Sequence, residues 1–119
     1  MKREILFRAK KITDNQWVTG GIAIAPDETV IILTKEEQIV WNVIPETVGQ
    51  FTGIIDINGI NVFEDDILHG GYKVEYFNGG FFGVKHRNDK YVHSLKKCSQ
   101  LQEFKVIGNV HDNLELLNK

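Results

Sequence analysis

Few side chains in this chain of 119 residues are spaced for acid–base, nucleophilic or metal chemistry. Cys98 is the only cysteine, and its context, Lys96-Lys97-Cys98-Ser99-Gln100, carries no signature of a catalytic nucleophile. The four histidines are His69, His86, His93 and His111. They form no His-x-His, His-Glu-x-x-His or Cys/His pattern of a metal site. We therefore expect no catalytic residue, no metal and no cofactor.

One pair of histidines leaves an alternative open. His86 and His93 would meet across a hairpin made by residues 84–86 and 91–93, with Asp89 in the turn. Two imidazoles placed in this way could hold a metal ion or share a proton. An enzyme built on this pair, or on the acidic run Glu64-Asp65-Asp66, is the third of three hypotheses for function.

The acidic run is better interpreted as turn chemistry. Neighbouring residues of a strand point to opposite faces, so Glu64, Asp65 and Asp66 cannot converge on a cation without a turn. Asp side chains accept backbone N–H groups readily in turns. We interpret Asp65 and Asp66 as turn residues at the start of a strand. Asn58-Gly59 predicts a second turn, of type I′.

Basic and aromatic side chains alternate after residue 84, which favours a nucleic-acid-binding alternative. Small β-barrels bind nucleic acid with Lys or Arg on the phosphates and aromatic rings on the bases. The candidate residues are Lys85, Arg87, Lys90, Tyr91, Lys96 and Lys97. The chain as a whole is slightly acidic, with a pI near 6.1, which weighs against this alternative.

These side chains must be positioned mainly by strands, because apolar residues alternate over short runs bounded by turn residues. We expect strands at residues 3–12, 16–25, 29–33, 38–43, 47–53, 61–63, 72–77, 81–86, 91–95 and 104–110. Gly20-Gly21 predicts a bulge or sharp bend. Short helices are expected near residues 94–102 and in the tail, where Asp112 and Glu115 have capping-box spacing. The expected fold is an all-β, barrel-like single domain over residues 1–119, with about 8–10 short strands and capping helices.

Composition and charge describe a soluble protein with segregated charge. Apolar residues make up 42% and charged residues 25%, and no run reaches the roughly 20 apolar residues of a membrane helix. The N-terminus has no secretory signal pattern, so we expect a cytoplasmic location and no membrane partner. Residues 1–12 and 83–97 each carry a net charge of +4, whereas residues 13–70 carry −9. Such segregation produces either opposite surface patches or strands that pair basic against acidic residues.

Three motifs in order resemble the YopX family of small proteins from phages and prophages of Gram-positive bacteria. The first is Arg3-Glu4-Ile5-Leu6-Phe7-Arg8-Ala9. The second runs from Ile44 to Gly53, through Asp56-Ile57-Asn58-Gly59, to Val62-Phe63-Glu64-Asp65-Asp66-Ile67-Leu68. The third is Val106-Ile107-Gly108-Asn109, continuing to Leu117. The chain departs from the family pattern at Asp65, where the family has Gly, and at Leu114, where it has Pro.

The resemblance implies a compact β-barrel-like domain of phage or prophage origin, and it brings no catalytic residue with it. Our leading hypothesis is a non-enzymatic accessory protein that works by binding a protein. The expected partner is a second copy of the chain or a protein of the host or phage, because small β-domains often cover their open strand edges with partners. The nucleic-acid-binding barrel is the alternative.

Overall fold

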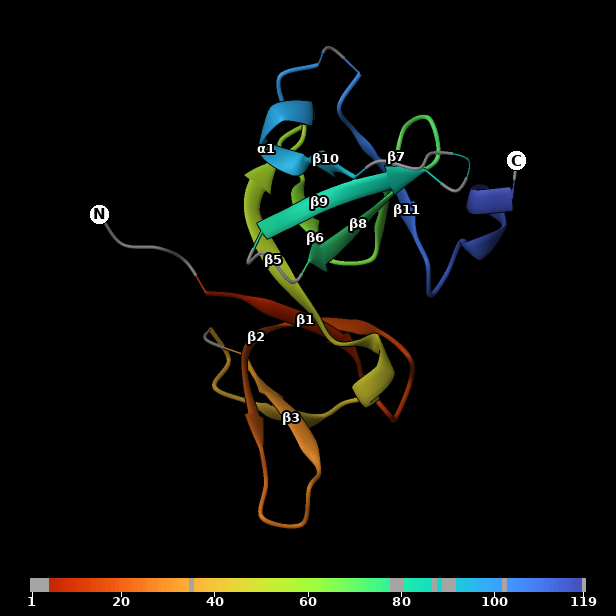
Figure 1. The fold of residues 1–119 in the computed structure, drawn as a ribbon. Helices are drawn as coiled ribbons and strands as arrows, with labels where there is room; N and C mark the ends of the chain where they lie inside the picture. Colours follow the sequence, from red (N-terminus) through yellow and green to blue (C-terminus); the bar gives the residue numbers. More distant parts are fainter. Residues whose placement is uncertain are drawn as a thin grey trace. The chain divides into compact units, whose positions relative to one another are not determined.

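The computed structural model describes residues 5–34, 36–77, 81–86, 88, 92–101 and 103–118, and within them the chain is mainly β (Figure 1). The strands are β1 (Phe7–Lys10), β2 (Trp17–Ile24), β3 (Val30–Leu33), β4 (Val40–Asn42), β5 (Gly49–Ile55), β6 (Asn61–Phe63), β7 (Asp66–Leu68), β8 (Tyr72–Phe77), β9 (Phe81–His86), β10 (His93–Ser94) and β11 (Val106–Asn109). The helices are α1 (Leu95–Cys98) and the 3-10 turns η1 (Pro45–Thr47) and η2 (Leu114–Asn118). The mainly-β class is confirmed. Among the described residues, no helix combines the length and the apolar character needed to cross a membrane.

The chain divides into two compact units, Met1–Phe51 and Thr52–Lys119. Strand β5 begins in the first unit and ends in the second. Each unit has its own cluster of buried apolar residues. The expectation of a single domain stays a prediction.

In the first unit, antiparallel strands lie in the order β4-β3-β2-β1, followed by the start of β5. Its buried core consists of Ala9, Ile32 and Val43. Alternate residues of a strand face the same side, so one face of each strand reaches this core. Val43 also forms a single bridge with Lys11, which brings the residues after β4 beside the residues after β1. The sheet curls, but within the described residues it does not close into a barrel.

The second unit contains a sheet with the strand order β10-β9-β8-β7-β11, and β6 pairs with the end of β5. The core residues are Val62, Leu68, Val74, Val84, Leu95 and Phe104. Leu95 is the residue through which α1 joins this core. The expected helix over residues 94–102 is reduced to α1, because the next apolar residue of that segment, Leu101, is exposed. The expected tail helix is likewise the short 3-10 turn η2.

The strand expected at residues 47–53 begins two residues later than expected. Residues 45–47 form the 3-10 turn η1, and β5 begins only at Gly49. The Thr47 hydroxyl donates to the Ile44 carbonyl at 2.7 Å and accepts the Lys10 N–H at 2.9 Å. The Thr47 side chain therefore satisfies the Ile44 carbonyl and the Lys10 N–H, which in a continuous strand would pair with backbone groups.

Of the bulge or sharp bend predicted at Gly20-Gly21, the bulge is absent, and the sharp bend stays a prediction. Gly20 pairs with Phe7 of β1 and Gly21 pairs with Leu33 of β3, and neither pairing shifts in register. A Cβ atom at Gly20 would collide with the Leu33 carbonyl oxygen, whereas a Cβ atom at Gly21 would meet nothing within 4 Å. The glycine at position 20 is therefore required by the close approach of another backbone.

Gly20→Ala should lower the free energy of unfolding by about 2 kcal/mol or more, because the added methyl group collides with backbone that cannot rotate away. Gly21→Ala is the matched control and should raise it by up to about 1 kcal/mol, because Ala loses less chain entropy than Gly in a strand. Chemical denaturation followed by tryptophan fluorescence measures both. Equal effects of the two substitutions would contradict this account of β2.

Candidate functional site

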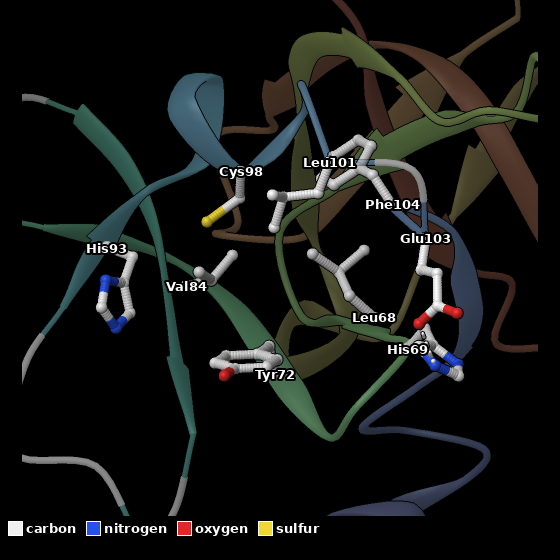
Figure 2. Close-up of a pocket in the computed structure, with 9 residues that line it drawn as sticks. All are labelled: Leu68, His69, Tyr72, Val84, His93, Cys98, Leu101, Glu103 and Phe104. Atoms are coloured by element: carbon white, nitrogen blue, oxygen red, sulfur yellow. Dashed lines mark ion pairs between the residues drawn. The ribbon is translucent and has the colours of Figure 1, made fainter.

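The second unit contains a half-open pocket of about 230 Å³ (Figure 2). Its lining comes from β7, β8, β9, β10, α1 and the segment that follows α1. The lining residues are Leu68, His69, Tyr72, Val84, His93, Cys98, Leu101, Glu103 and Phe104. Most of them are apolar or aromatic, so the pocket is an apolar hollow with a few polar groups at its rim.

The floor of the pocket follows from strand register. Leu68 pairs with Tyr72 between β7 and β8, and Val84 of β9 pairs with Val74 of β8 and with His93 of β10. Residues that pair across antiparallel strands point to the same face. The sheet therefore directs Leu68, Tyr72, Val84 and His93 to one side, where α1 and Phe104 also lie.

The polar groups of the pocket pair with one another or with aromatic rings. His69 Nε2 lies 2.9 Å from Glu103 Oε2. The Tyr72 ring makes edge contacts with two imidazoles, His86 at 5.3 Å and His93 at 6.5 Å between ring centroids. His93 pairs with Val84 across the ladder, so His86, two residues further along β9, is a diagonal neighbour of His93 on the same face and not its direct partner. No group of three or more His, Cys, Asp or Glu in the described part of the chain could hold a metal ion.

Cys98 lies in the pocket as a half-buried thiol, and Figure 2 shows its sulfur beside Val84. Burial raises the pKa of Cys98, and the nearby charge of Lys97 only partly offsets this effect. A raised pKa leaves less thiolate at neutral pH, and the thiolate is the reactive form. The cysteine therefore has the character of a lining residue rather than that of an activated nucleophile.

The acidic run forms a tight turn between β6 and β7. Asp65 has a φ of 69°, in the left-handed region that Asp tolerates better than most residues. The buried Asp66 carboxylate accepts the Phe63 N–H at 2.8 Å. Asp65 lies 3.3 Å from His111 and 3.9 Å from Lys73, measured between side-chain nitrogen and oxygen atoms. These carboxylates hold the turn and its neighbours.

The third motif of the sequence is also a turn. Asn109 N–H donates to the Asn113 side-chain oxygen at 3.2 Å, and Asn113 N–H donates to the Asn109 carbonyl at 2.8 Å. The Asn109 side-chain oxygen accepts the N–H groups of His111 and Asp112. A Cβ atom at Gly108 would lie 2.7 Å from the same Asn113 oxygen, which explains the glycine. The motif therefore shapes the chain after β11.

The turn at Asn58-Gly59 is not the predicted type I′ turn. Only Gly59 has a positive φ, of 78°. The Gly59 N–H donates to the Asp56 carbonyl at 3.0 Å, and the Asp56 N–H donates to the Ile60 carbonyl at 2.8 Å. The loop is a three-residue type with glycine in the left-handed position. The difference arises because the Asp56 carboxylate accepts the Asn58 N–H and fixes the preceding residues in an Asx turn.

Asp56 is the structural residue that the sequence interpretation missed. Its carboxylate is 4% exposed and accepts three backbone N–H groups, from Asn58 at 2.8 Å, Ile60 at 2.9 Å and Val106 at 3.0 Å. Burial alone would raise the pKa of Asp56, but the three N–H donors outweigh burial and the pKa is lowered. The Asp-x-Asn-Gly spacing was visible in the sequence, whereas the bond to Val106, 50 residues away, was not.

The basic stretch after residue 84 does not gather on one face, as far as its described residues show. Lys85 lines a shallow hollow with Lys73, Glu75 and Leu117, on the face of β9 opposite to Val84. Lys96 and Lys97 are exposed on α1, which packs on the Val84 side. Arg87, Lys90 and Tyr91 lie outside the described residues. Binding of nucleic acid through this stretch stays a prediction.

Asp56→Asn should lower the free energy of unfolding by about 2–3 kcal/mol, because the amide cannot accept three N–H groups and its own NH₂ would face one of them. Because the folded pKa is lowered, the stabilisation by Asp56 is fully present above the unfolded pKa of about 3.9. It is lost as pH falls through the lower folded pKa. Denaturant titrations between pH 2 and pH 7 should show a shallower acid loss in the variant. Asp14→Asn, at an exposed aspartate that accepts the Gln16 N–H, is the control and should change stability little.

Iodoacetamide should alkylate Cys98 more slowly in the folded protein at pH 7 than in the denatured chain, because the folded thiol is half-buried and its pKa is raised. The rate should rise with pH. Mass spectrometry of timed samples measures it, and the denatured chain is the matched control. Faster alkylation of the folded protein would indicate an activated cysteine instead.

The chain was compared with curated proteins and with models of protein families. Curated proteins return no match. The family model YopX, described as YopX protein, matches residues 6–118, which is nearly the whole chain and includes the second and third motifs and the end of the first. The chain therefore belongs to the YopX family.

Proposed function

We propose that this protein is a non-enzymatic accessory protein of phage or prophage origin that works by binding another protein in the bacterial cytoplasm. The observation that supports this most directly is the apolar pocket of the second unit. The proposal assigns the pocket to a partner's side chain.

The size of the pocket favours a side chain over a small-molecule ligand. Sites for small molecules and cofactors usually enclose about 300–1,000 Å³, and this pocket has about 230 Å³. Its apolar floor of Leu68, Val84 and Phe104 suits one apolar anchor. Such anchors carry much of the affinity of protein interfaces when they fill a pocket that excludes water.

The rim of the pocket also resembles that of an interface. Exposed polar groups, His69 with Glu103 on one side and His93 on another, surround the apolar centre. Protein interfaces have this arrangement of a dry centre and a polar rim. The raised pKa of the Cys98 thiol makes it a poor nucleophile, which supports binding rather than nucleophilic catalysis at this pocket.

Leu101→Asp should reduce partner capture at least about tenfold, because it places a charge at the mouth of the apolar pocket. Leu101 is 63% exposed, so the substitution should leave stability nearly unchanged. The tagged protein, cross-linked in the bacterial host and purified, is compared with the variant by quantitative mass spectrometry. Untagged copies of the chain count as partners.

Leu114→Asp is the matched control, since Leu114 is 58% exposed and lies outside the pocket. It should capture partners as the unchanged protein does. The proposal fails if Leu101→Asp and Leu114→Asp behave alike, or if the unchanged protein captures nothing and is a monomer by light scattering.

A further inference from the structure

The β2–β3 hairpin of the first unit ends in a projecting apolar side chain. Ile24, the last residue of β2, is 71% exposed, the largest exposed fraction among the described large apolar residues that are exposed. Figure 1 shows this hairpin extending away from the other strands of its unit. In the isolated protein this apolar side chain is exposed to water, which is unfavourable. The side chain is therefore available for burial against a partner.

The tip that carries Ile24 is ordered by its own hydrogen bonds. The Ala25 N–H donates to the Thr29 carbonyl at 2.8 Å, and the Glu28 N–H donates to the Ala25 carbonyl at 2.8 Å. The Thr29 N–H donates to Asp27 Oδ1 at 3.1 Å. A tip held in one conformation loses little entropy when it docks.

The tip is acidic, and the helix that carries one of the pocket residues presents two exposed lysines. Asp27 and Glu28 are both exposed at the tip, with no basic residue between Ile24 and Val30. Lys96 and Lys97 are exposed on α1, directly before the lining residue Cys98. The one acidic lining residue, Glu103, lies across the pocket from Cys98 and is paired with His69 (Figure 2).

We propose that the occupant of the pocket is Ile24 of a second copy of this chain, with Asp27 and Glu28 of that copy beside Lys96 and Lys97. This inference rests on the proposed function, since it names the partner of the same pocket. The side chain matches the apolar floor, and the flanking charges are complementary. Because the hairpin and the pocket are different surfaces, one such contact leaves a hairpin and a pocket free. These can close reciprocally into a twofold dimer or continue into a ring or an open chain.

A mixed disulfide tests this contact because Cys98 is the only cysteine and lines the pocket. One tagged copy carries Ile24→Cys and Cys98→Ser, and a second copy with a different tag keeps the natural sequence. A disulfide between the two tags can then join only position 24 of one copy to Cys98 of the other. After mild oxidation at pH 8.5, we expect this species as the main cross-linked product, identified by peptide mass spectrometry.

The matched control carries Ile12→Cys with Cys98→Ser, since Ile12 is 57% exposed and belongs to the same unit. It should give at least about tenfold less of the mixed disulfide. Asp27→Lys with Glu28→Lys should reduce the position-24 product by a similar factor, and Lys96→Glu with Lys97→Glu in the other copy should restore it.

Sedimentation velocity gives a readout that does not depend on thiol reactivity. The natural protein should self-associate as its concentration rises, Ile24→Asp should remove this association, and Ile12→Asp should leave it. A monomer at all concentrations, or a mixed disulfide equal to that of the control, overturns the inference. If Leu101→Asp still removes partner capture in that case, the pocket binds a different protein and the proposed function stands. If it does not, both fail.

Discussion

The buried carboxylate of Asp56 is the constraint on which the second unit depends. It joins the turn after β5 to the start of β11 through N–H groups of Ile60 and Val106. The segment just before Val106 supplies Leu101, Glu103 and Phe104 to the pocket, and the Ile57 N–H donates to the Phe104 carbonyl at 3.0 Å. One wall of the pocket is thus fixed by an aspartate that lines no part of it. Short strands leave many backbone groups at their ends, and a buried carboxylate can satisfy several of them at once.

The sequence predicted what is local. Alternating apolar residues indicated the strands, and the Asp and Asn residues of the second motif marked turns, because both signals act over a few residues. The geometry that depends on distant segments was not visible. The Asn58-Gly59 turn was assigned the wrong type because the Asp56 carboxylate competes for its backbone. The Gly20 requirement comes from the carbonyl of Leu33 on the next strand, which no local pattern reports.

The pocket could be predicted only in part. The strands that carry Tyr72 and Val84 were expected, and Cys98 was expected to be no catalytic nucleophile, but nothing in the spacing brings Cys98, His69 and Glu103 to the same hollow. The floor of that hollow depends on the register of the sheet, which directs Leu68, Tyr72 and Val84 to one face. The resemblance to the family covered the turns at Asn58-Gly59 and Asp65-Asp66 but carried no information on what the pocket receives.

Burial decides what the recurring aspartates of this chain do. Asp56 and Asp66 are buried, and their carboxylates accept hydrogen bonds from backbone N–H groups that would otherwise be unsatisfied. Asp27 makes the same kind of bond at an exposed tip, where the Thr29 hydroxyl and N–H lower its pKa while its charge still faces water. The same turn chemistry therefore stabilises the fold in one unit and presents a charge in the other. A partner can recognise only the second kind of charge, so among these aspartates it is Asp27, at the exposed tip, that can complement a basic surface.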